Sequence, residues 1–220
     1  MKYDENKIVI FDWGGIVESH REGEYSLFKV LTNILQTFNP KVKENEVIQG
    51  WKECSKDKNG IEIGATNDIK QIKGWYERVQ EKFSFKSDFT TFQKIYHKEF
   101  AKIHFYQDVV ELEHKTKERC KVGILSNLML LDKERINAQV NLSKMDYVWL
   151  SFEMEAKKPD KKIYEMVQQE CKIEPQNILF IEDTEENIKT AQSMGWNTCK
   201  AYGYEIDKIK QSIEAFLQEN

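Results

Sequence analysis

The sequence predicts an α/β fold: a doubly wound, Rossmann-like parallel sheet with an α-helical domain inserted after its first strand. Two observations indicate this. In the second half of the chain, short apolar runs alternate with amphipathic helical segments, as in a parallel sheet covered by helices on both faces. Before that region lies a long stretch with helical spacing and many aromatic residues. At 220 residues the chain is long enough for a domain that carries an insertion.

The first strand is predicted at residues 8–11, an apolar run that leads directly into Asp12. Gly14 and Gly15 follow and free the backbone for a turn. Taken alone, this segment has two interpretations. Asp12 is either a turn residue that accepts hydrogen bonds from local amides, or a carboxylate presented at the strand end for chemistry.

A helical block follows this strand. Residues 23–38 place apolar side chains on one helical face, and Asn39-Pro40 ends that helix. The next sixty or so residues stay helical and aromatic-rich, without an alternating strand pattern of useful length. We therefore expect a helical cap domain at residues 18–103 and an α/β core formed by residues 1–17 and 104–220.

The remaining strands and helices of the core follow in order. The apolar runs that predict strands are residues 121–127, 147–151, 177–183 and 197–202. The amphipathic segments that predict helices are residues 159–171, with Pro159 suited to the first turn, 184–194, closed by Gly195, and 205–217.

Composition excludes several classes of function. The formal net charge is -4 and no basic stretch is interleaved with aromatic residues, which argues against nucleic acid as the main partner. No apolar run approaches the ~20 residues that a membrane span needs. The polar start resembles neither a secretory signal nor a transit peptide, so we expect a cytoplasmic protein. Nothing in the sequence indicates the oligomeric state.

The cysteines predict neither disulfides nor a zinc site, because they are far apart and form no CxxC pair. We expect reduced thiols that are mostly buried as small apolar side chains. They are Cys54, Cys120, Cys171 and Cys199.

Polar side chains stand where the predicted strands end. Ligands of an open parallel sheet bind just beyond the carboxyl ends of its strands, so these positions are candidates for a site. In chain order they are Asp12, the pair Ser126 and Asn127, Lys158 before a helix, and the pair Glu182 and Asp183.

Each of these has an alternative interpretation when it is taken alone. Ser126 and Asn127 could cap the start of a helix. Lys158 is one of many lysines. Glu182 and Asp183 could belong to an acidic first helical turn that suits the helix dipole. The joint pattern of a carboxylate, a hydroxyl–amide pair, a lysine and an acidic pair is much harder to explain in this way.

At these positions the sequence resembles the haloacid dehalogenase (HAD) superfamily, across essentially the whole chain. The matching segments are "VIFDWGG", "VGILSN", "KKPDKKIY" and "ILFIEDTEENIKTAQSMGW". Their spacing is similar to that of members with a helical cap inserted after the first motif. The third and fourth segments resemble the phosphatase branch.

The resemblance implies a magnesium-dependent phosphatase of a small phosphorylated metabolite, such as a sugar phosphate. Asp12 would be the nucleophile that forms an aspartyl-phosphate. Mg²⁺ would be held by the carboxylates of Asp12 and Asp183 and by the backbone carbonyl of Gly14. The physics agrees, because a phosphate dianion is repelled by a carboxylate unless a divalent cation and a lysine offset the charge.

The resemblance also implies supporting roles. Ser126 and the backbone amide of Asn127 would bind phosphate oxygens, and Lys158 would neutralise charge between nucleophile and phosphate. Glu182 would orient Asp183 or a water on the metal, and Asn187 would hold the loop in place.

One position departs from the phosphatase pattern. The family normally places a second Asp, the general acid and base, two residues after the nucleophile, and here that residue is Gly14. One alternative is therefore a slow or inactive protein that binds phosphorylated metabolites. Another is a haloacid dehalogenase, which needs no metal. Candidate substrate contacts or hinge residues near the insertion are Trp13, Glu18, His20 and Arg21.

Overall fold

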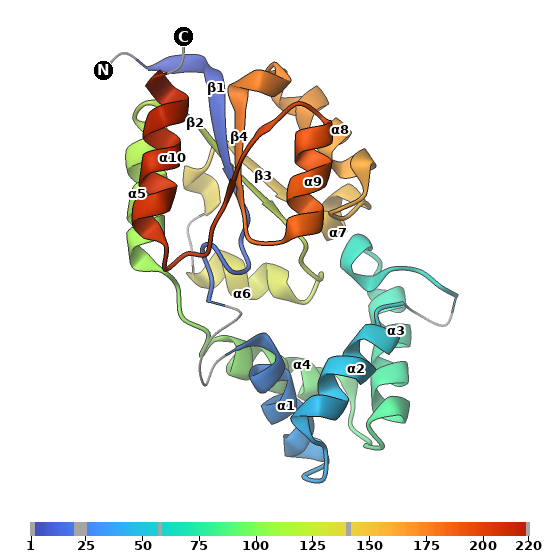
Figure 1. The fold of residues 1–220 in the computed structure, drawn as a ribbon. Coiled ribbons are helices and arrows are strands. Elements are labelled where there is room, and N and C mark those ends of the chain that lie inside the picture. The colour runs from blue at the N-terminus through green and yellow to red at the C-terminus, as the bar shows by residue number, and fades with distance from the viewer. Residues whose placement is uncertain (1–2, 20–25, 57–58, 140–141, 219–220) are drawn as a thin grey trace.

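The computed structural model describes residues 3–19, 26–56, 59–139 and 142–218. Its centre is a five-stranded sheet in the order β3-β2-β1-β4-β5, in which every neighbouring pair is parallel (Figure 1). The predicted α/β fold is confirmed. The strands are β1 Asp4–Phe11, β2 Cys120–Ser126, β3 Tyr147–Leu150, β4 Ile178–Glu182 and β5 Asn197–Lys200.

Helices account for most of the other described residues. Those of the insert are α1 Leu27–Phe38, α2 Glu44–Glu53, α3 Ile69–Lys82 and α4 Phe89–Phe100, with a short 3₁₀ helix, η2 Ile63–Ala65. Those of the core are α5 Gln107–Lys117, α6 Asp132–Gln139, α7 Ser151–Met154, α8 Lys161–Cys171, α9 Glu185–Ser193 and α10 Ile206–Gln218, with 3₁₀ helices η3 Leu142–Lys144 and η4 Pro175–Asn177.

The alternation of side chains along β1 explains how both faces of the sheet are covered. Val9 and Phe11 belong to one apolar cluster, which includes residues of α5 and α10. Ile8 and Ile10 point to the opposite face and pack with residues of α8 and α9. All four side chains are completely buried. Figure 1 shows α5 and α10 on one side of the sheet and α9 on the other.

The inserted helices surround an apolar cluster of their own. Aromatic rings dominate it; for example, the ring centroids of Tyr76 and Phe92 are 4.7 Å apart and those of Tyr96 and Phe100 are 4.2 Å apart. Leu131, from the segment after β2, also packs into this cluster. Figure 1 shows α1–α4 gathered beyond the ends of the strands. The domain boundaries at residues 17/18 and 103/104 stay a prediction.

Hydrogen bonds and an ion pair join the insert to the core. At its base, the amide of Ser19 donates to the carbonyl of His104 at 2.9 Å, so the outgoing and returning chains run side by side. Further along, the Ser151 hydroxyl of α7 donates to the carbonyl of Gly64 in η2, and Lys157 pairs with Glu62 at 2.7 Å. These contacts hold the insert against the edge of the sheet where the polar residues lie.

Several predicted boundaries differ from the structure. The helix predicted at residues 159–171 begins at Lys161, because Asp160 caps it by accepting from the amide of Lys162. The alternative interpretation of Ser126 and Asn127 as a helix cap does not hold, since the next helix begins at Asp132. Helices α5, α6 and α7 were not predicted. The start of the helix expected at residues 23–38 lies partly outside the described residues.

All four cysteines are buried and none forms a disulfide with another described residue; their burial agrees with the prediction of mostly buried side chains. None of the helices in the described part of the chain combines the length and the hydropathy that a membrane span requires.

Glu113 of α5 is a buried carboxyl group outside the site. It is 1% exposed, and neither of its oxygens has a hydrogen-bond partner among the described residues. Burial raises the pKa of this carboxyl from 4.5 to about 8. Between those values the folded protein therefore binds a proton that the unfolded chain has lost.

We expect the free energy of unfolding to fall as the pH rises from 5 to 8, by up to about 1.4 kcal/mol per pH unit from this group. In Glu113→Gln the titrating group is gone, so that part of the slope disappears. Urea unfolding at a series of pH values measures it. The control is Glu111→Gln on the same helix. The Glu111 side chain is 68% exposed, so we expect this variant to keep the pH dependence of the parent. Equal slopes in Glu113→Gln and the parent would contradict this account.

Candidate active site

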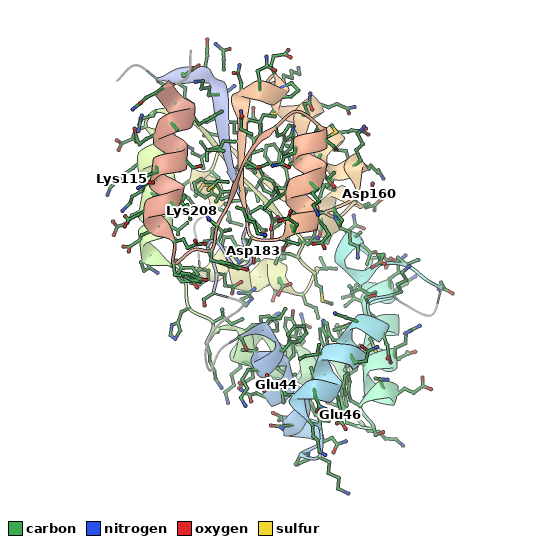
Figure 2. The ribbon with its side chains drawn as sticks, in the orientation of Figure 1. Glu44, Glu46, Lys115, Asp160, Asp183 and Lys208 are labelled. Atoms are coloured by element: carbon green, nitrogen blue, oxygen red, sulfur yellow. The ribbon has the colours of Figure 1, made fainter. Side chains whose placement is uncertain are left out.

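The candidate site lies at the topological switch point of the sheet, between β1 and β4. β1 and β4 are neighbours in the sheet, so the residues that follow them meet at the same edge. The amide of Asp12 donates to the carbonyl of Ile181 at 2.9 Å, which fixes Asp12 beside the end of β4. Figure 2 labels Asp183 at the end of the core that faces the insert. The topology thus brings the first and the last predicted motif together.

Lys158 lies between two carboxylates of this site. Its Nζ is 2.7 Å from Asp12 Oδ1 and 2.7 Å from Glu182 Oε2, and all three side chains are buried. Burial works to lower the pKa of Lys158, but Asp12 and Glu182 outweigh it and leave this pKa above its ordinary value. Lys158 therefore remains an ammonium group in the folded protein.

The two carboxylates respond differently to burial. Burial, and then the charge of Glu182, raise the pKa of Asp12 well above its ordinary range, against the opposing effect of Lys158. Burial also works to raise the pKa of Glu182, but Lys158 and the donors around its oxygens lower it to about 2. Glu182 thus keeps its negative charge beside Lys158. Asp12 lines a cavity, and its charged form is disfavoured.

Both oxygens of Glu182 are occupied by donors. Oε1 accepts from the amides of Asp183 and Thr184 at 3.0 and 2.9 Å. Oε2 accepts from Lys158 and from the side-chain amide of Asn187 at 2.7 and 2.8 Å. Glu182 therefore orients the loop that carries Asp183 and has no oxygen left to serve as a primary metal ligand.

Ser126 and Asn127 lie at the end of β2 and line the cavity that Asp12 also lines. The Asn127 side chain exchanges two hydrogen bonds with the backbone of Lys158, each 2.8 Å long. This pair holds the Lys158 segment against β2, a role that the sequence did not indicate. Ser126 is 2% exposed.

The turn after Asp12 depends on Gly15. Gly15 has φ +87° and donates to the carbonyl of Glu18 at 2.7 Å, and its own carbonyl accepts from Gly203 at 2.8 Å. A Cβ added at Gly15 would lie 2.4 Å from Asp183 Oδ2. Glycine is needed here both for its backbone conformation and for the close approach of the Asp183 carboxylate.

Trp13 and Glu18, two of the candidate substrate contacts, belong to a buried cluster instead. Glu18 is 0% exposed, accepts from Trp13 Nε1 at 2.7 Å and forms an ion pair with Arg135 of α6. Arg135 also pairs with Asp132, which accepts from the hydroxyl of Tyr96 of the insert at 3.1 Å. The cluster ties the first turn to the insert. The other two candidates, His20 and Arg21, lie outside the described residues.

A cavity of about 590 Å³ opens over the strand ends. From the core it is lined by Asp12, Gly14, Ser126, Asn127, Lys158, Asp183, Thr184 and Asn187. From the insert it is lined by Ser26, Leu27, Phe28, Glu44 and Ile48. The structure thus brings together every predicted core position, apart from Glu182, which lies directly behind them. The sequence analysis did not indicate the five insert residues or Thr184 as part of a site. Of these, only Thr184 has a local feature that could have indicated it, its position next to the acidic pair Glu182 and Asp183.

The donor set suits a small divalent cation. Oxygen atoms of Asp12, Glu182 and Asp183 lie within 4.8 Å of one another, and all three side chains are buried. Among the described residues Lys158 pairs with Asp12 and Glu182 but not with Asp183, so this buried acidic cluster needs further positive charge. Mg²⁺ prefers one or two carboxylates together with carbonyl, water and phosphate oxygens. Asp12 and Asp183 fit as ligands, with the Gly14 carbonyl at the same cavity, while Glu182 supports them.

Comparison with known proteins identifies one family. A family model described as haloacid dehalogenase-like hydrolase matches residues 9–201. None of the curated proteins matches the chain.

Solved structures with the same fold come from several bacteria. An HAD family enzyme from Bacteroides thetaiotaomicron, in complex with magnesium and inorganic phosphate, is 19% identical, with a TM-score of 0.64 over 90% of this chain and 94% of that one. A predicted HAD-like family hydrolase from Porphyromonas gingivalis is 15% identical, with a TM-score of 0.72 over 99% and 100%. L-2-haloacid dehalogenase from Xanthobacter autotrophicus, with chloropropionic acid covalently bound, is 17% identical, with a TM-score of 0.63 over 89% and 77%.

The close approach of Gly15 to Asp183 generates a prediction about metal binding. In Gly15→Ala the new Cβ displaces the Asp183 carboxylate, so we expect Mg²⁺ affinity to fall by at least about tenfold, as in Asp183→Asn. Calorimetric titration with Mg²⁺ measures this. Gly60→Ala is the matched control, because Gly60 also has a positive φ, +82°, but no atom within 4 Å of the added Cβ. Parent-like affinity in Gly15→Ala and Asp183→Asn would place the metal elsewhere.

Proposed function

Because the chain belongs to the haloacid dehalogenase-like hydrolase family, we propose that it is a magnesium-dependent phosphomonoesterase of a small phosphorylated metabolite. The supporting observation is the charge of the site. Three buried carboxylates lie close together beside a cavity of about 590 Å³, and one ammonium group, that of Lys158, pairs with two of them. The structure of a family member with magnesium and inorganic phosphate adds support for this proposal.

The acidic pair favours phosphate esters over haloacids as substrates. A dehalogenase would attack carbon without a metal and would have no use for Asp183 next to the nucleophile. A phosphate dianion cannot approach Asp12 until positive charge offsets the repulsion between them. Bound Mg²⁺ would supply that charge and would polarise the phosphoryl oxygens.

The chain's own residues would divide the reaction as follows. A carboxylate oxygen of Asp12 attacks phosphorus, the bond to the ester oxygen breaks, and the alcohol leaves with a proton taken from water. Ser126 and the backbone amide of Asn127 hold phosphoryl oxygens, and Lys158 offsets their charge. Water then attacks the aspartyl-phosphate, which releases inorganic phosphate and restores the Asp12 carboxylate.

Gly14 leaves this reaction without the family's usual proton donor. Glu18, just past the glycine turn, does not replace it, because Glu18 is completely buried in its ion pair with Arg135 and does not line the cavity. His20, the next titratable residue along the chain, lies outside the described residues. The proposal therefore includes slow proton transfer, and it leaves a binding protein of low activity as the alternative.

Phosphate release from a panel of phosphate monoesters, with and without Mg²⁺, tests the proposed function. We expect release that requires Mg²⁺ and falls by at least about 10³-fold in Asp12→Asn, because the amide cannot attack phosphorus. The control is Asp88→Asn, a helix cap in the insert that an asparagine can still form. Chloride release from 2-chloropropionate would instead support a dehalogenase. Binding of the esters without turnover would support a binding protein.

The missing carboxylate at Gly14 has a kinetic consequence. General acid–base help is worth roughly 10²–10⁴-fold, so water attack on the aspartyl-phosphate should be slow enough for that species to accumulate. With a good leaving group such as 4-nitrophenolate, rapid mixing should show a burst of nitrophenol followed by slower release of phosphate. Gly14→Asp should shrink the burst. Simultaneous release of both products in the parent would mean that another residue supplies the proton.

A further inference from the structure

The cavity has two walls of different chemistry. The core wall carries the charged groups already described. The insert wall comes from the start of α1 and one face of α2, with Leu27 and Phe28 from the first helix and Glu44 and Ile48 from the second. Figure 2 labels Glu44 on the insert and Asp183 on the core opposite it. A substrate phosphate bound at Asp12 and Lys158 would direct its leaving group towards this second wall.

The insert wall is largely apolar. Ile48 is 38% exposed, which is unusual for a large apolar side chain of the described residues, and its neighbours Leu27 and Phe28 are half-buried. Glu44 and Ile48 are four residues apart on α2 and therefore share a helical face. An apolar side chain left in contact with water at a cavity favours a ligand that covers it with carbon.

Glu44 is the one charged side chain that the described part of the insert contributes to the cavity lining. Lys29 lies 3.8 Å from Glu44 Oε2, but it does not line the cavity, and both side chains are nearly half exposed. Such a pair interacts weakly. A leaving group in the cavity therefore meets a carboxylate, which repels a second anion and accepts a hydrogen bond from a hydroxyl or an ammonium group.

Resting on the proposed function, we propose that the insert wall selects phosphate monoesters whose leaving group has a carbon surface for Ile48 and a hydrogen-bond donor for Glu44. Esters that carry a second anionic group, whether phosphate or carboxylate, are disfavoured. Glu44 and Ile48 are then determinants of substrate class. They act on the leaving group and not on the transferred phosphate.

Three esters of matched size test the charge selection: 2-aminoethyl, 2-hydroxyethyl and carboxymethyl phosphate. We expect the ratio of kcat/KM for the aminoethyl ester to that for the carboxymethyl ester to fall about tenfold in Glu44→Gln, mainly through KM. Comparing ratios between proteins cancels the different intrinsic reactivity of the esters. In Lys29→Met the same ratio should rise, because the opposing charge is removed.

Glu46→Gln is the matched control for charge. Glu46 lies on the same helix, outside the cavity lining, and accepts from the amide of Lys43, which a glutamine can also do. It should keep the parent ratio. An unchanged ratio in Glu44→Gln overturns the inference. An equal loss of turnover for all three esters in Glu44→Gln also overturns it, because Glu44 would then serve the chemistry and not the choice of leaving group.

The apolar part of the proposal has its own pair of variants. Ile48→Asn should lower kcat/KM for phenyl phosphate, relative to 2-hydroxyethyl phosphate, by about fivefold, since the ring loses its apolar contact. Ile69→Asn is the control, because Ile69 is 45% exposed on α3 and does not line the cavity. Equal effects of the two variants would contradict the role of Ile48.

Failure of the proposed function is a separate outcome. If the parent releases no phosphate from any of these esters with Mg²⁺, the phosphatase proposal fails. The same esters can then be titrated calorimetrically into the unreactive parent and Glu44→Gln proteins. A ratio of dissociation constants that shifts about tenfold between the two proteins supports the charge selection, and an unchanged ratio overturns it.

Discussion

The buried ammonium group of Lys158 is the contact on which the rest of the site depends. It is shared between Asp12 at the end of β1 and Glu182 at the end of β4, at 2.7 Å from each. Removing one member of such a buried group typically costs about 3–5 kcal/mol, because a charge is left uncompensated in a medium that cannot solvate it. The ends of two strands and the segment before α8 therefore hold one another in place.

The turn after β1 connects this site to the insert. Gly15 gives the Asp183 carboxylate room at the site, while Glu18, three residues later, forms the ion pair with Arg135. Through Asp132 that cluster reaches the hydroxyl of Tyr96 on α4. One short segment thus positions both the candidate nucleophile and the helices that close the cavity. A substitution at Gly15 is therefore expected to affect the contact with the insert, and a substitution at Glu18 to affect the site.

The fold alone does not decide the chemistry. A magnesium- and phosphate-bound enzyme and a haloacid dehalogenase match this chain with TM-scores of 0.64 and 0.63, which are nearly equal. What distinguishes the possible reactions is the set of groups at the strand ends. Our proposal of phosphoryl transfer rests on that set: a carboxyl group of raised pKa at Asp12, the charged Lys158, and Asp183 close to Asp12.

The sequence by itself determined the α/β class, the helical insertion and the polar positions at the strand ends. These features can be predicted because they are local: apolar runs end in Asp12, Ser126 and Glu182, and parallel strands must bring such ends to one edge. Only the tertiary structure decided which partners these groups have. Glu18 and Arg135 are 117 residues apart in the chain. Glu44 and Ile48 have the pattern of ordinary helical surface, and they line a cavity only because α2 lies beyond the strand ends that carry the polar residues. The pairing of distant side chains leaves no periodic trace in the sequence.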